Sequence, residues 1–134
     1  MYDDLLQEFI EKLNKGEFRL PVCTSCNAKV WPPSRYCPEC LSKTSLKIVD
    51  TRGTLVHFTQ SYLKGMEGCY GLIEMSGIKL IGSFETVKLK EGLKVRMARC
   101  GVRSDGTPYY VFKPVKGRHS YTLANKPLDE TYEL

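Results

Sequence analysis

Four cysteines, arranged in two pairs, are the residues of this chain best placed to do chemistry. The pairs have C-x-x-C spacing and are separated by ten residues: Cys23 and Cys26, then Cys37 and Cys40. Two such pairs on neighbouring turns can place four thiolates around one tetrahedral ion, the closed shell that structural zinc prefers. The spacing therefore predicts a structural Zn²⁺ site. Iron in the same shell and disulfide bonds are the alternatives, and catalytic zinc is disfavoured because the shell has no open position.

The first residues of the chain bear on which of these alternatives holds. The sequence Met1-Tyr2-Asp3-Asp4 is acidic, whereas a secretory signal peptide begins with basic residues and continues into an apolar stretch. We therefore expect a cytoplasmic protein in a reducing compartment, where paired cysteines are more often metal ligands than disulfides. No apolar run approaches the roughly 20 residues of a membrane span, so we expect no membrane partner.

The remaining cysteines and the histidines are weak candidates for catalysis. A thiolase-type cysteine nucleophile needs a histidine nearby. Outside the two pairs the chain contains Cys69 and Cys100, and its two histidines are His57 and His119. Free cysteines are mostly buried and behave as small hydrophobic residues, and His57 falls within a predicted strand. We expect no catalytic residue in this chain.

The middle of the chain is basic. Six cations lie between residues 86 and 103 against the single acid Glu91: Lys88, Lys90, Lys94, Arg96, Arg99 and Arg103. Such a run favours an anionic ligand, for example the phosphates of a nucleotide or of nucleic acid, or the acidic face of a partner. The candidate anion-binding residues are Lys94, Arg96, Arg99 and Arg103. A solvated strand face is the alternative explanation for each of them.

The elements before the basic run must position the cysteines. Residues 3–15 are predicted to form a helix because apolar residues recur along one stripe, and Gly16 can end it in the left-handed conformation. Residues 18–45 form the cysteine module. Trp31-Pro32-Pro33 lies between the pairs and excludes a helix there. We expect Trp31 and Tyr36 to cover the metal or to wedge against the next domain.

From Leu46 the pattern changes to alternating β-branched and aromatic residues. Strands are predicted near 46–50, 54–63, 69–76, 78–86, 93–100 and 109–115. Tight turns are predicted at Ser76-Gly77 and at Ser104-Asp105-Gly106. No crossover helix separates the strands, so we expect an antiparallel sheet closed into a small barrel, with the five-stranded OB-fold as the leading candidate.

Taken together, the elements predict a mainly β protein built from four parts. The expected boundaries are an amphipathic helix at 1–17, a zinc ribbon at 18–45, an OB-fold barrel at 46–116 and a C-terminal tail at 117–134.

Three segments resemble a known family. They are Gly16 to Cys23, Trp31 to Cys40 with its P-P-S-R-Y-C-P core, and Thr51 to Thr59, which reads T-R-G-T-L-V-H-F-T. In this order they resemble the acyl-CoA-associated OB-fold proteins with an N-terminal rubredoxin-like zinc ribbon, the domain of unknown function 35 family. The resemblance extends from the helix to about Pro114. It departs at residues 64–70, where many relatives carry prolines and this chain has none.

The resemblance implies a non-catalytic accessory subunit. Members of this family partner thiolase-like enzymes, hydroxymethylglutaryl-CoA-synthase-like enzymes or hot-dog-fold hydratases, and are thought to hold or pass an acyl-CoA thioester. Binding CoA requires cations for the phosphates and a narrow apolar groove for the pantetheine arm. The basic run and the aromatic residues Tyr62, Tyr70 and Phe84 are compatible with that requirement.

A second function class remains open. OB barrels that carry basic residues and exposed aromatic side chains bind single-stranded nucleic acid, with the bases stacked on the aromatic rings. Here Tyr109, Tyr110 and Phe112, together with Arg96 and Arg99, would form such a surface. Burial of the same aromatic residues in the barrel core is the alternative.

Overall fold

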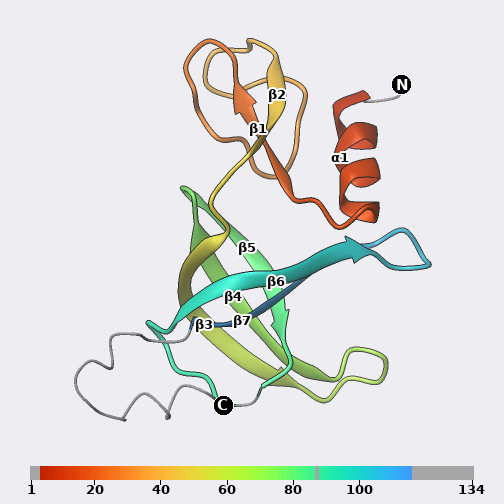
Figure 1. Cartoon of the computed structure of the whole chain (residues 1–134), viewed down its shortest axis with the longest axis vertical. Helices are drawn as coiled ribbons and strands as arrows, with labels where there is room; N and C mark the ends of the chain where they lie inside the picture. Colours follow the sequence, from red (N-terminus) through yellow and green to blue (C-terminus); the bar gives the residue numbers. More distant parts are fainter. Residues whose placement is uncertain (1–3, 87, 116–134) are drawn as a thin grey trace.

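The computed structural model describes residues 4–86 and 88–115. Its elements in chain order are α1 (Asp4–Asn14), β1 (Arg19–Cys23), β2 (Thr44–Ile48), β3 (Arg52–Ser61), β4 (Gly68–Met75), β5 (Ile78–Phe84), β6 (Lys94–Val102) and β7 (Pro108–Pro114). β1 and β2 form a two-stranded sheet, and the other five strands close into a barrel in the order β3-β4-β5-β7-β6. Figure 1 shows the two-stranded module stacked on one end of the barrel, with α1 beside it. The predicted mainly β fold, with a helix, a ribbon and an OB-type barrel, is confirmed.

The helix forms as its apolar stripe predicts. α1 buries Leu5, Phe9 and Leu13 against the rest of the protein. It ends where Gly16 adopts a φ of 82°, a conformation that glycine enters without steric cost. A helix of this length is marginal alone in water, so packing of this stripe is what stabilises it.

The strand expected at 46–50 does not belong to the barrel. The observed strand, β2, pairs with β1 in the antiparallel ribbon sheet, where Pro21 lies opposite Leu46. The first barrel strand is instead β3, which begins at Arg52. Residue alternation identifies a strand but not its partner. Here the intervening loop brings β1 alongside β2, and β1 was not predicted as a strand.

The barrel hairpins match their sequence signals. At the β4–β5 turn, Ser76 and Gly77 have φ values of 48° and 82°, and positive values at both central positions fit the twist of the adjoining strands. The β6–β7 turn contains Gly106 at a φ of 89°. Along β5 burial alternates strictly, so Ile78, Leu80, Gly82 and Phe84 face the core.

Gly82, on the inward face of β5, leaves room for a large neighbour. A Cβ atom at this position would lie 2.5 Å from Cδ1 of Phe112 and 3.0 Å from Cδ1 of Ile73. Phe112 is fully buried at 0% exposure. The glycine therefore lets the β7 aromatic ring pack directly on the backbone of β5, a close approach of the kind that marks glycine within strands.

An aromatic cluster joins the helix, the ribbon and the barrel. The ring of Trp31 lies 5.8 Å from that of Phe9, 6.0 Å from that of Phe18 and 6.1 Å from that of Tyr110 on β7. Burial raises the pKa of the Tyr110 phenol. Of the two roles expected for Trp31, the structure therefore shows the wedge, whereas Tyr36 is half exposed. The three parts share one hydrophobic core, which fixes the ribbon relative to the barrel.

The C-terminal tail expected at 117–134 lies outside the described residues. Within the described ranges, no helix has the length and apolar character needed to cross a membrane.

Candidate metal centre and ligand groove

The four paired cysteines meet at the end of the ribbon far from the barrel. Their Sγ atoms all lie within 4.8 Å of one another. The Sγ atoms are 3.4 Å apart in Cys23 and Cys40, 3.7 Å apart in Cys26 and Cys37, and 3.8 Å apart in Cys26 and Cys40. Four sulfurs at about 2.3 Å from a tetrahedral Zn²⁺ would be separated by about 3.8 Å. The cluster therefore has the size of a zinc-thiolate shell.

The backbone of the first turn is shaped to stabilise the thiolate of Cys23. The amides of Ser25 and Cys26 donate to Sγ of Cys23 at 3.3 and 3.4 Å. These hydrogen bonds, that of the Cys26 amide foremost, lower the pKa of Cys23 to about 6. Because a metal binds the thiolate and not the thiol, the turn prepares this residue for a cation.

The second pair repeats the arrangement. The Glu39 amide donates to Sγ of Cys37 at 3.3 Å. Asn27 and Leu41, which follow the two pairs, have φ values of 63° and 66°. Asparagine tolerates this region of backbone space, whereas leucine is strained in it. Two matched turns thus hold four sulfurs in a closed shell. The donors fit a structural metal, and the residues that would hold it are Cys23, Cys26, Cys37 and Cys40.

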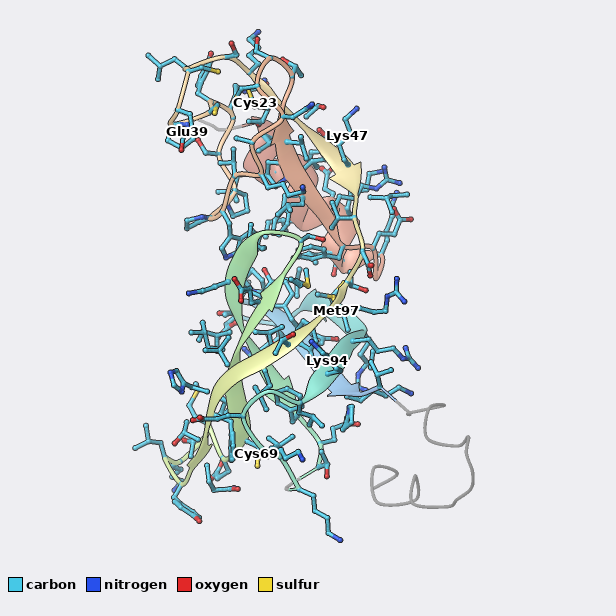
Figure 2. The ribbon with its side chains drawn as sticks, turned by 90° about the vertical axis from the view of Figure 1, so that its left-hand side faces the viewer. Cys23, Glu39, Lys47, Cys69, Lys94 and Met97 are labelled. Carbon is cyan, nitrogen blue, oxygen red and sulfur yellow. The ribbon has the colours of Figure 1, made fainter. Side chains whose placement is uncertain are left out.

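The two remaining cysteines are buried in the barrel. Sγ of Cys69 on β4 donates to Oε1 of Gln60 at 3.0 Å. Cys100 on β6 is buried as well, and desolvation raises the pKa of its thiol, which is the opposite of an activated nucleophile. Figure 2 shows Cys69 near the end of the molecule opposite Cys23. Both residues have the buried, small-hydrophobe character that we expected.

His57 lies on the exposed surface of β3. Its Nδ1 atom is 3.0 Å from Oε2 of Glu91, which belongs to the connection between β5 and β6. This contact ties the loop to the barrel wall. His119 lies outside the described residues.

The predicted anion-binding residues are separated by the fold. Lys94 and Arg96 lie at the start of β6, where Arg96 pairs with Arg52 of β3. Arg99 forms an ion pair with Glu85, and this contact lowers the pKa of the Glu85 carboxyl. Arg103 lies beyond β6 in the hairpin that leads to β7. The basic run thus supplies cations to more than one part of the surface.

A groove of 210 Å³ lies on the wall formed by β4, β5 and β7. Its lining comes from these three strands, the β3–β4 loop and the β6–β7 hairpin, and includes Met66, Tyr70, Ile81, Arg103, Pro108 and Tyr109. OB-folds bind extended ligands on this face, between the loops that follow their first and fourth strands. Those loops correspond here to the β3–β4 and β6–β7 connections. The groove therefore occupies the ligand-binding position of the fold.

The groove combines one cation with apolar and aromatic walls. The guanidinium of Arg103 lies 5.7 Å from the centre of the Tyr109 ring. Ile81 is 60% exposed and Met66 49% exposed, so apolar side chains stand open to a ligand. A ligand whose anionic group pairs with Arg103 could place its apolar part against these side chains.

Sequence analysis found Arg103 and Tyr70 but missed Met66, Ile81 and Pro108. Ile81 offered a signal, because it interrupts the outward polar positions of its strand between Lys79 and Ser83. Met66 and Pro108 reach the groove only because two distant loops converge. No pattern in the sequence around these residues indicates that the two loops meet.

The aromatic surface considered for nucleic acid is only partly exposed. Phe112 is fully buried, and Tyr110 packs against Phe18 and Trp31. Of the three aromatic residues expected there, Tyr109 remains available in the groove.

Comparison with known proteins agrees with this architecture. Residues 11–45 match the family model described as "ChsH2, rubredoxin-like zinc ribbon domain". A solved structure described as "Ltp2-ChsH2(DUF35) aldolase" superposes with a TM-score of 0.67 and 18% identity, covering 85% of this chain and 95% of that chain. At that identity the likeness establishes the fold. The chain has no match among curated proteins. The rubredoxin-like zinc ribbon and the resemblance to the domain of unknown function 35 family are thereby confirmed.

Proposed function

We propose that this protein is a non-catalytic accessory subunit that binds acyl-CoA thioesters or helps to channel them, and that it scaffolds an acyl-CoA enzyme. The observation that supports the proposal is the groove on the wall of β4, β5 and β7, with Arg103 in one part of its lining and apolar side chains in another. CoA is an anionic nucleotide joined to a long neutral arm. A groove with one cation and apolar walls matches that division of charge.

The groove suits part of such a ligand rather than all of it. Ligand pockets for drug-sized molecules occupy about 300–1,000 Å³, and the groove measures 210 Å³. It can therefore hold a segment of the pantetheine arm or one phosphate while a partner covers the rest. A shared site of this kind explains why a subunit without its own catalytic residues would contact the substrate.

The partner is inferred from the solved relative. That relative is described as an Ltp2-ChsH2(DUF35) aldolase, which associates the same fold with an enzyme. We propose an enzyme partner for this chain as well, of the thiolase-like, hydroxymethylglutaryl-CoA-synthase-like or hydratase class. The Zn²⁺ ion would have a structural role in this scheme, because four cysteine ligands leave no position for substrate.

Calorimetric titration with CoA tests the groove. We expect Arg103→Glu to weaken CoA binding about ten-fold or more, because a charge-assisted hydrogen bond contributes about 1.5–3 kcal/mol. Arg96→Glu provides the matched control: it makes the same charge change on β6 but lies outside the groove. Measurement at about 0.15 M salt screens contributions beyond about 8 Å. If Arg96→Glu weakened binding while Arg103→Glu did not, the groove would not be the CoA site.

Affinity purification of the tagged protein from its native host tests the partner. We expect stoichiometric recovery of a thiolase-like, synthase-like or hydratase enzyme that is unaffected by nuclease treatment. Nuclease-sensitive recovery of ribosomal or single-strand-binding proteins would instead support nucleic-acid binding, since the OB ligand face also accepts oligonucleotides. A failed CoA titration alongside a recovered acyl-CoA enzyme would retain the scaffold and reject direct ligand contact.

A further inference from the structure

A patch of four cations lies on the barrel wall away from the groove. We call Arg52, Lys94, Arg96 and Lys113 the basic face. Arg96 on β6 lies directly opposite Arg52 on β3 and opposite Lys113 on β7. Lys94 precedes Arg96 by two residues, so its side chain leaves the same side of the strand. All four residues are exposed, and Figure 2 shows Lys94 at the side of the molecule, between the two ends marked by Cys23 and Cys69.

The charges of the basic face are mostly uncompensated. Arg52 donates to both carboxylate oxygens of Asp50, at 3.0 and 2.9 Å, and Lys94 donates to the Thr54 hydroxyl at 3.0 Å. Within residues 4–86 and 88–115, neither Arg96 nor Lys113 forms an ion pair. Like charges directly opposite one another on a sheet are destabilising. An anion bound across the three strands would relieve this repulsion.

A hollow of 670 Å³ opens beside the basic face. Arg52 and Lys94 line it together with Val115, which is partly exposed, whereas its other apolar neighbours, Met75 and Val95, are buried in the core. Asp50, which is held by Arg52, and Glu74 also contribute to its wall. The cations of this wall without an ion pair among the described residues are therefore on the face beside the hollow, at Lys94, Arg96 and Lys113, and they fit an acidic peptide.

The chain itself leaves the barrel at this place. The Val115 amide donates to the carbonyl oxygen of Lys94 at 2.9 Å, and Val115 is the last residue that the structure describes. The sequence continues for 19 residues. Its acids are all in the final part, Pro127-Leu128-Asp129-Glu130-Thr131-Tyr132-Glu133-Leu134, whereas its cations, Lys116, Arg118 and Lys126, come before.

We propose that residues 127–134 bind the basic face of the same chain. Asp129 lies fourteen positions after Val115, and an extended chain of that length reaches about 46–50 Å, which is ample for a return to the face. Tethering gives the segment an effective concentration on the order of millimolar, so weak pairing is sufficient. In this proposal Asp129 and Glu130 supply the negative charges that pair with Arg96 and Lys113.

The consequence is a shielded basic face. The face lies on β3, β6 and the end of β7 at Lys113, whereas the groove is lined by β4, β5 and the start of β7 at Pro108 and Tyr109. The bound segment therefore leaves the groove open and excludes other anions from the basic face. The inference is independent of CoA binding, since the basic face shares no residue with the groove.

Nuclear magnetic resonance on the full chain labelled with ¹⁵N tests the proposal. Neutralising the segment with Asp129→Asn, Glu130→Gln and Glu133→Gln should shift the amide signals of Arg52, Arg96 and Lys113. The matched control neutralises three acids elsewhere, with Glu8→Gln, Glu11→Gln and Glu67→Gln, and should leave those signals in place. Raising salt from about 0.01 M to about 1 M shortens the Debye length from about 30 to about 3 Å and should reproduce the shift in the unmodified chain.

A charge exchange makes the assignment specific. Arg96→Glu with Lys113→Glu should release the segment, moving the amide signals of residues 128–133 to the positions they have at high salt. Adding Asp129→Lys, Glu130→Lys and Glu133→Lys to that variant should restore the low-salt shifts. The proposal is wrong if neutralising the segment leaves the amide signals of Arg96 and Lys113 unmoved. If added pyrophosphate then moves those signals, the face binds an external anion instead.

Discussion

Replacing Cys37 with serine is expected to abolish stoichiometric metal binding and to unfold the ribbon. Cys37 is fully buried, and its Sγ atom lies 3.7 Å from that of Cys26 within the four-sulfur cluster. Structural zinc supplies an apparent folding free energy of about 10–16 kcal/mol at neutral pH, comparable to the whole stability of many domains, about 5–15 kcal/mol. Metal content measured by mass spectrometry and thermal unfolding followed by circular dichroism check the result.

Cys100→Ala is the matched control for that experiment. Cys100 is also a buried cysteine, but it lies on β6 outside the metal cluster. We expect it to retain one metal ion per chain and to lose only the packing of one sulfur. Full metal content and unchanged melting in Cys37→Ser would contradict the structural role of the centre. Metal analysis of the unmodified chain also decides between zinc and iron.

Removing the Phe112 ring is expected to cost the barrel about 3–5 kcal/mol, the range measured for phenylalanine-to-alanine changes in protein cores. Phe112 is fully buried, and its ring centre lies 6.3 Å from that of Phe84. The ring also fills the space that Gly82 leaves on β5. Gly82 has no side chain that could move into the cavity left by the ring. We therefore expect a loss of unfolding free energy toward the upper part of this range. Urea denaturation measures it.

Phe58→Ala provides the same chemical change at a different depth. Phe58 on β3 is 40% exposed, and its removal should therefore cost clearly less than the removal of Phe112. Equal midpoints for the two variants in urea would show that Phe112 does not anchor the core.

Several features of this protein were determined by short stretches of sequence alone. The two C-x-x-C pairs specified the metal cluster, because two residues of spacing suffice to turn the backbone around an ion. Ser76-Gly77 specified a hairpin, and the alternation around Leu80 specified which side of β5 faces the core. Each of these depends on the conformation of a few neighbouring residues. Such local signals can be read without knowing the fold.

Other features depended on contacts between distant segments. β2 was expected in the barrel and pairs instead with β1, since alternation carries no information about the partner strand. The groove likewise exists only because the loop carrying Met66 and the hairpin carrying Arg103 converge on the same wall.

The basic run shows the limit most clearly. Its sequence predicted that these cations bind an anion together, but a single strand cannot place all of them on one face. The pairing of β6 with β7 shifts between Met97 and Arg99, and a bulge of this kind turns the residues beyond it toward a different direction. Closure of the barrel then places Arg96 beside Arg52 and Lys113, and leaves Arg103 at the groove. The sequence by itself determined the metal ligands, the turns and the presence of a positively charged strand. The tertiary structure decided which charges act together, because register and barrel closure are set by packing across the whole core.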